Sequence, residues 1–168
     1  MWARKTFHDC AEELKIVSED FRAAFTNKFR MDEQRRNQQL QNLSQRGIEI
    51  LRILALAIRS EQDFGITPKI NETVGALKSN ANTSEMFSAL NSYRPPYDEQ
   101  LGFNPLGLRE ALNKIAHANP DKSGFYADAS IHDLILCGKR DGNNWIAIIS
   151  LIELCRVIKS VPDRMIQK

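Results

Sequence analysis

The chain has 168 residues, of which 42% are hydrophobic and 26% charged, and its formal net charge at pH 7 is +2. A chain of this length corresponds to about one ordinary domain and buries enough apolar surface to fold without a metal ion or a disulfide. The composition excludes collagen-like, disordered and membrane-spanning classes, and the even charge excludes a strongly basic coat protein and an acidic tail. We therefore expect a single globular domain spanning residues 1–168.

Two helices are predicted in the first third of the chain. Apolar residues recur at three- and four-residue steps over residues 6–28 and again over residues 40–58, which is the period of a helix with a buried face. The polar segment 30–41 is either an exposed part of a helix or a mobile connection, and the sequence leaves both open. The second helix is apolar around more than half of its circumference, so we expect it to lie centrally or to pack against a second chain. Phe64 and Gly65 mark its end.

Three further helices are predicted in the middle of the chain. A threonine–proline pair at 67–68 and an asparagine–proline pair at 104–105 each match an N-cap followed by a first-turn proline. The first of these helices is expected to reach about position 78 and the second position 118. Between them, Asn82 or Ser84 is expected to cap a short helix over residues 85–92.

A β-hairpin and a last helix are predicted near the C-terminus. Residues 131–137 and 145–149 are rich in branched apolar side chains, and a Lys-Arg-Asp-Gly-Asn-Asn turn separates them, whereas residues 121–130 are expected to be a loop. Ser150 and Glu153 then stand at capping-box spacing at the start of the last helix. The predicted fold class is therefore mainly α, a helical bundle with a small C-terminal β-hairpin before the last helix.

Three polar side chains at four-residue steps mark the predicted helix over residues 104–118. Arg109, Asn113 and His117 lie along one edge of it, at the border of its apolar stripe. Arginine offers a charged planar fork for a phosphate, histidine exchanges a proton near neutral pH, and asparagine holds a hydroxyl or an imidazole. Such a trio suits metal-free cleavage of RNA.

A purely structural role for the same side chains is the alternative. His117 lies in the last helical turn, where the helix dipole favours an imidazolium, and Asn113 could bond a loop carbonyl. Arg109 could pair with a surface carboxylate, for which the candidates are Glu85, Asp98 and Asp133.

A resemblance to a known superfamily rests on residues 108–118, which read Leu-Arg-Glu-Ala-Leu-Asn-Lys-Ile-Ala-His-Ala, and on the following hairpin with Gly138 and Trp145 and the last helix. This part of the chain looks like a group of bacterial proteins that in turn resemble the HEPN superfamily. HEPN domains are small helical bundles, often dimeric, found in toxin–antitoxin, phage-defence and RNA-processing systems. Many of them are metal-independent ribonucleases.

The HEPN motif is an arginine, four to six intervening residues and a histidine, and a polar residue commonly follows the arginine. Asn113 and His117 fit the polar residue and the histidine. Leu112 stands where the motif has arginine, and Arg109 lies one turn earlier.

Two functions follow from these observations. The first, implied by the resemblance, is a metal-independent endoribonuclease whose catalytic residues are His117, Arg109 and Asn113. Its RNA contact would be local and doubled by a homodimer, with the contacts made by Lys114, Lys139 and Arg140. The second is a non-catalytic helical interaction module, an accessory or neutralising partner of another protein from the same operon, because position 112 lacks the arginine.

The cysteines favour a reducing compartment and argue against a metal site. They are odd in number and far apart in the sequence: Cys10, Cys137 and Cys155. We therefore expect buried thiols in a reducing cytoplasm, with no secretory signal, and the most apolar stretch is too short and too charged to span a membrane. His8 and His132 each lie near a cysteine without a second matching pair, so no metal or other cofactor is expected.

Overall fold

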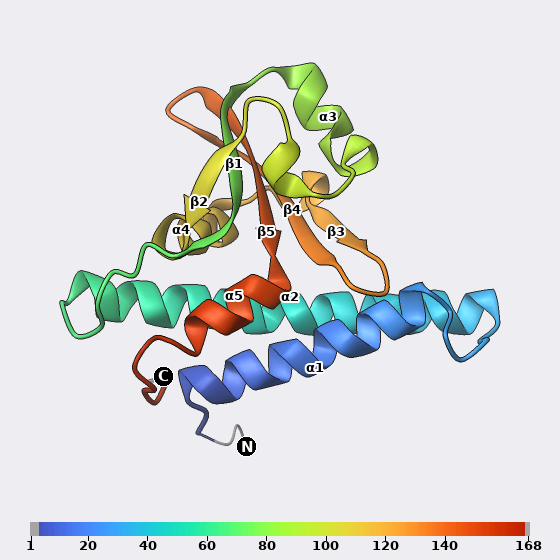
Figure 1. The fold of residues 1–168 in the computed structure, drawn as a ribbon, viewed down its shortest axis with the longest axis horizontal. Helices are drawn as coiled ribbons and strands as arrows, with labels where there is room; N and C mark the ends of the chain where they lie inside the picture. The colour runs from blue at the N-terminus through green and yellow to red at the C-terminus, as the bar shows by residue number, and fades with distance from the viewer. Residues whose placement is uncertain (1–3, 167–168) are drawn as a thin grey trace.

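The computed structural model describes residues 4–166 and alternates helices with strands (Figure 1). The helices are α1 (Phe7–Phe25), α2 (Glu33–Asp63), α3 (Thr83–Ser92), α4 (Leu108–His117) and α5 (Leu151–Ile158), with two short 3-10 helices, η1 (Tyr97–Glu99) and η2 (Pro120–Lys122). The strands are β1 (Thr73–Ala81), β2 (Asn104–Gly107), β3 (Gly124–Ala127), β4 (His132–Arg140) and β5 (Asn143–Ser150). They form one antiparallel sheet in the order β2-β1-β5-β4-β3.

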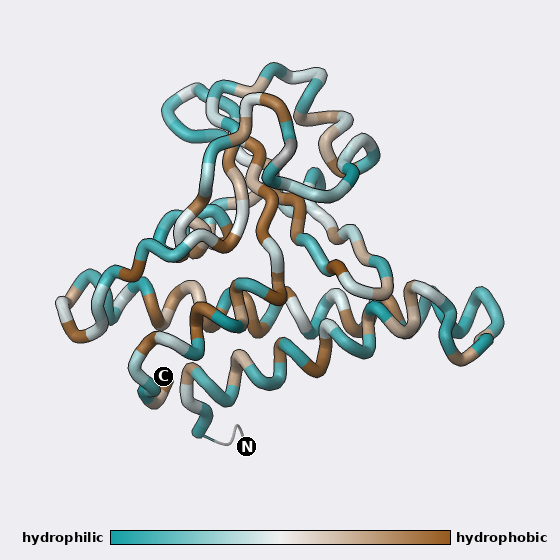
Figure 2. Tube along the Cα trace, viewed as in Figure 1, coloured by the Kyte–Doolittle hydropathy of each residue, from teal (hydrophilic) through white to brown (hydrophobic). Residues whose placement is uncertain are grey.

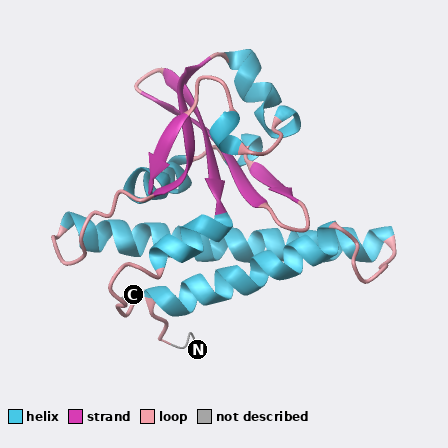
Figure 3. Ribbon diagram, viewed as in Figure 1, coloured by secondary structure: helices cyan, strands magenta, loops and turns pink. Residues whose placement is uncertain are grey.

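The sheet stands on a layer of helices made by α1, α2 and α5, and α3 covers the sheet face opposite α4 (Figures 1 and 3). Alternate side chains of β4 and β5 supply two cores, because successive residues of a strand point to opposite faces. Leu136 and Ala147 join the main core with the helices of the base, whereas Ile135 and Ile148 pack with Tyr93 beside α3. Hydrophobic residues are therefore concentrated in the middle of the sheet (Figure 2).

The predicted fold class is wrong, since the chain has a mixed α/β fold with a five-stranded sheet and is not a helical bundle with a hairpin. The hairpin itself is confirmed as β4–β5, but it forms the centre of the sheet. Both strands are buried on both faces over most of their length. Runs of apolar residues without alternation are typical of such strands, which need layers on either side and neighbouring strands beside them.

Two segments predicted as helix starts are strands or loops instead. Thr67 donates a hydrogen bond to Glu61 at the end of α2, and the chain then extends into β1. Pro105 lies in β2, an edge strand, where a residue without an N–H group is tolerated. Helix α4 therefore begins only at Leu108, after Gly107, which offers no side-chain cap. The expected loop over residues 121–130 contains the short strand β3.

Other predicted elements are confirmed. Helices α1 and α2 match the two N-terminal patterns, and the polar segment between them lies mostly within α2, which Asp32 caps, so it is an exposed part of a helix. Asn82 caps α3 through the backbone N–H of Glu85. Ser150 caps α5 by accepting a hydrogen bond of 3.2 Å from the backbone N–H of Glu153.

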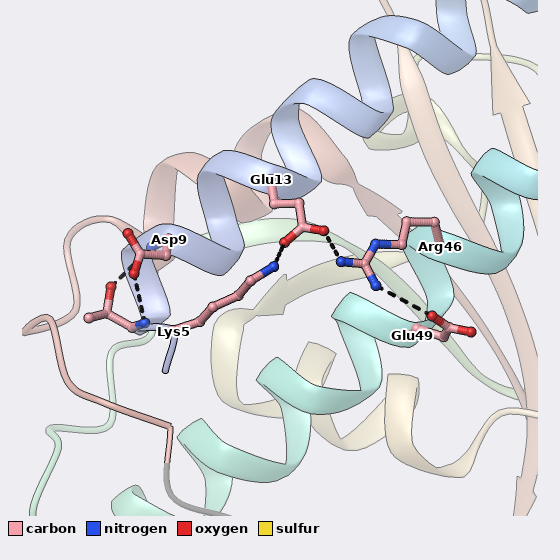
Figure 4. Close-up of polar contacts among 6 residues, drawn as sticks. Lys5, Asp9, Glu13, Arg46 and Glu49 are labelled. Atoms are coloured by element: carbon pink, nitrogen blue, oxygen red, sulfur yellow. Dashed lines mark hydrogen bonds and ion pairs between the residues drawn. The ribbon is translucent and has the colours of Figure 1, made fainter. Parts of the chain in front are cut away.

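A cluster of charges ties α1 to α2 on the base of the molecule (Figure 4). The Glu13 carboxylate of α1 accepts hydrogen bonds from Lys5 and from Arg46 of α2, and Arg46 also pairs with Glu49. Partial burial alone would raise the pKa of the Glu13 carboxyl, but the two cationic donors outweigh it and hold that pKa below its usual range. This pairing fixes how the two base helices lie beside each other.

Candidate functional site

Helix α4 connects the base of the molecule to the sheet. It packs along α2 and contacts β1, β2, β4 and β5. Its apolar side, formed by Leu108, Ala111, Leu112 and Ile115, is buried in the main core. The polar side chains predicted to form the site are therefore carried by a helix that packs between α2 and the sheet.

Arg109 reaches from α4 to the C-terminal end of α2. Its guanidinium donates hydrogen bonds to the Arg59 carbonyl at 3.0 Å, to Gln62 Oε1 at 3.3 Å and to Asp63 Oδ1 at 2.7 Å. The last turn of α2 has no basic residue of its own. Arg109 supplies the positive charge that stabilises carbonyls at a helix C-terminus. The carboxylate beside it is Asp63 and none of the three candidates named from the sequence.

Replacing Arg109 is expected to weaken the fold. In Arg109→Met the buried Gln62 amide and the Arg59 carbonyl lose a charged donor, so the free energy of unfolding should fall by about 2 kcal/mol in urea titrations. The matched control is Arg52→Met on the exposed side of α2, where a change within about 0.5 kcal/mol is expected. Equal stability of the two variants would contradict the structural role of Arg109.

Asn113 and His117 have different surroundings from Arg109. The Asn113 amide donates to Glu110 Oε2 at 3.0 Å within α4. His117 is exposed at the last turn of α4 and has no hydrogen-bond or ion-pair partner among residues 4–166. The structure thus gives the three predicted catalytic residues three separate environments, and their catalytic role stays a prediction.

Lys114 is buried although it carries a charge. Its Nζ lies 4.5 Å from the centroid of the Trp145 ring and 3.2 Å from Glu110 Oε1. The Trp145 ring lies against the bare backbone of Gly138, where an added Cβ would be 2.2 Å from the ring atom Cζ2. These contacts are the cation–π interaction and the ion pair that make burial of an ammonium tolerable.

Glu110 stands between two cations. Partial burial would raise the pKa of its carboxyl, but hydrogen bonds from Asn113 and Lys114 and the positive charges of Lys114 and Arg140 outweigh that and lower it. Glu110 is therefore ionised at neutral pH.

A pocket of about 250 Å³ opens beside this ion pair. It lies between α4, the end of β1 and the turn of the β4–β5 hairpin. Its walls include Glu110, Lys114, Arg140 and three asparagines, which are Asn80, Asn143 and Asn144. The pocket brings together two of the three residues predicted to contact RNA, and the third, Lys139, is exposed on the neighbouring position of β4.

Two buried titratable residues on β4 were not singled out from the sequence as site candidates. His132 Nδ1 lies 2.8 Å from Ser18 Oγ of α1 and the ring stacks on Phe21, and burial lowers the pKa of His132 to about 4. Asp133 faces the opposite side of the sheet and accepts a hydrogen bond from the Tyr93 hydroxyl. His132 and Asp133 directly precede a run of apolar residues in a predicted strand. This position is the sign in the sequence that both side chains are buried.

No protein-family model, curated protein or solved structure matches the chain. Over the described residues, no group of three or more histidine, cysteine, aspartate or glutamate side chains is placed to hold a metal ion. Within residues 4–166, no helix has the length and apolar character needed to cross a membrane.

Proposed function

We propose that the protein is a non-catalytic binding module whose partner is single-stranded RNA. The observation that carries this proposal is the pocket in which Arg140 and Lys114 meet three asparagines, with Lys139 exposed beside it. Unpaired RNA is recognised by such a mixture, because exposed cations attract its phosphates, guanidinium planes stack on its bases and amides bond its base edges. The Arg140 side chain is 73% exposed and Lys139 is also exposed, so both side chains are open to a bound strand.

The surroundings of Arg109 support binding without cleavage. A catalytic arginine has to stabilise charge that develops on the phosphate, and this requires a guanidinium directed at the substrate. The Arg109 guanidinium donates its hydrogen bonds to the end of α2, and the Asn113 amide donates to Glu110. Of the predicted trio only His117 is exposed, and a single imidazole lacks the electrostatic partner of phosphodiester cleavage.

The test is an equilibrium titration of a fluorescent single-stranded RNA by fluorescence anisotropy in EDTA. In Lys139→Gln/Arg140→Gln, binding should weaken about tenfold and the salt slope should fall by about 0.7 for each lost phosphate contact. The control is Lys28→Gln/Arg30→Gln, which removes the same charge from the exposed α1–α2 loop, remote from the hairpin (Figure 1). Equal weakening of both double variants, or no binding by the wild type, would contradict the proposal.

A second candidate function, metal-independent RNA cleavage of the HEPN type, is favoured by the exposure of His117 at the end of α4. An imidazole in this position is open to a ribose hydroxyl of bound RNA. Cleavage of RNA in EDTA by the wild type that disappears in His117→Ala would establish it.

The proposal also includes the cytoplasm as the compartment, since the three thiols are free and buried. A homodimer through α2, and a protein partner from the same operon, stay predictions. Leu56 on α2 is 71% exposed. If α2 pairs two copies, sedimentation equilibrium should find a wild-type dimer that dissociates in Leu56→Glu, and a monomeric wild type would contradict the dimer.

A further inference from the structure

We propose that the pocket between α4 and the β4–β5 hairpin holds one unpaired nucleobase. This inference rests on the proposed function, because it names the part of the RNA that the hairpin end recognises. The base of a free mononucleotide and an unpaired base in an RNA strand have the same chemistry, and the experiment below distinguishes these two ligands.

The size and lining of the pocket fit a single base. Its volume of about 250 Å³ is below the range of about 300 to 1,000 Å³ of drug-sized sites, so it suits a single ring system better than a larger ligand. The amides of Asn80, Asn143 and Asn144 each offer donors and an acceptor. An asparagine amide pairs with the adjacent donor and acceptor on the edge of a base, as it does with adenine.

The charge balance favours a neutral ligand. Lys114 is paired with Glu110, and Arg140 lies 3.7 Å from the Asp141 carboxylate, so two cations in the walls face two anions. An isolated anion would have to displace one of these carboxylates, whereas an uncharged base leaves both pairs intact. The phosphate of the same nucleotide then lies outside, towards the exposed Lys139.

The backbone at the pocket adopts conformations that most residues avoid. Asn80 has a φ of 55° at a register irregularity of β1, and Asp141 has a φ of 50° in the hairpin turn. Asparagine and aspartate tolerate this region better than other residues with a Cβ, and such positions concentrate at binding sites. Both residues line the pocket, one from each wall.

Stacking of the base is assigned to Arg140. Trp145 lines the pocket but is only 4% exposed, because its ring lies against Gly138 and carries Lys114, so little of the ring is open to a base. The Arg140 guanidinium is planar, largely exposed and at the rim, and guanidinium planes stack on unpaired bases. Arg140 therefore supplies the planar face against which the base stacks.

The inference is tested with Asn80→Gly, which removes the amide while keeping the left-handed backbone at no steric cost. The matched control is Asn27→Gly, since Asn27 also has a positive φ, of 52°, but lies in the α1–α2 loop. Binding of four homopolymeric RNAs, of the four nucleoside monophosphates and of ribose 5-phosphate is measured for each protein. We expect one base to be preferred, ribose 5-phosphate not to bind, and Asn80→Gly to lose about tenfold in affinity with Asn27→Gly unchanged.

The outcomes separate this inference from the proposed function. Wild-type binding to all four RNAs with equal affinity, undiminished in Asn80→Gly, overturns the base pocket and leaves RNA binding in place. Base-selective binding of monophosphates without RNA binding supports the pocket and overturns the RNA-binding function. If the wild type binds neither RNA nor monophosphates, both are wrong.

Discussion

Gly75→Ala is expected to destabilise the protein by about 3 kcal/mol, measured as the free energy of unfolding in urea. A Cβ at position 75 would lie 2.0 Å from the backbone oxygen of Ile148 and 3.0 Å from the Cα of Ile149. These are backbone atoms of β5, at the centre of the sheet, and they have no rotamer with which to move away. The two strands can accept the methyl group only by separating, so hydrogen bonds of the β1–β5 ladder are lost.

The matched control is the same substitution in a helix. Gly47 lies within α2, and a Cβ there would meet only Val17 Cγ1 at an ordinary contact distance of 3.7 Å. Gly47→Ala should therefore stabilise the protein by about 0.5 to 1 kcal/mol, because glycine is a poor helix former. If both variants changed stability in the same direction by similar amounts, the close approach of β1 to β5 would be wrong.

Asp133→Asn is expected to make the protein more stable at pH 8, by up to about 3 kcal/mol. Burial raises the pKa of the Asp133 carboxyl to about 6. The negative charge of Asp128 also raises this pKa, whereas the hydrogen bond from the Tyr93 hydroxyl lowers it in part. The folded state thus binds this proton more tightly than the unfolded state. In the wild type, the stability that the protonated Asp133 allows is complete below about pH 4. It is lost as the pH rises to about 6, because the buried carboxyl then becomes charged.

The amide of the variant keeps the shape and an acceptor for Tyr93 but carries no charge at any pH. Near pH 4 the variant and the wild type should therefore differ little, and the difference should grow between pH 4 and pH 6. Urea titrations at several pH values measure it, with Asp20→Asn on the exposed side of α1 as the control. A difference that does not depend on pH would contradict a buried carboxyl at this position.

The helices of the base could be predicted from the sequence because their signals are local. The 3.6-residue period of α1 and α2, the cap at Asn82 and the cap at Ser150 depend on residues within a few positions of one another. The sheet could not be predicted in this way. Strand β1 pairs with β5 about 70 positions later, and such non-local pairing leaves no local period.

Two local signals were ambiguous. A residue with a side-chain acceptor before a proline is typical of a helix start, but it is also found in loops and edge strands, as at Pro68 and Pro105. Gly75, inside the segment predicted as a helix, was the contrary signal, since glycine in a strand often marks a close approach of two backbones.

The candidate site was predictable only in part. Spacing placed Arg109, Asn113 and His117 on one helix edge, but the partner of Arg109 lies at the end of α2, 46 positions earlier. Lys114 and Arg140 were predicted to contact RNA, and the pocket they share depends on how α4 lies against the hairpin. The environment of each side chain, and with it the difference between a structural and a binding role, is set by these tertiary contacts.

The most direct test of the account follows a single-stranded RNA bound to the wild-type protein in EDTA and measures how much stays intact. We expect the RNA to be bound, the binding to depend on Lys139 and Arg140, and the RNA to be uncut after prolonged incubation. Cleavage by the wild type that is abolished in His117→Ala would contradict it.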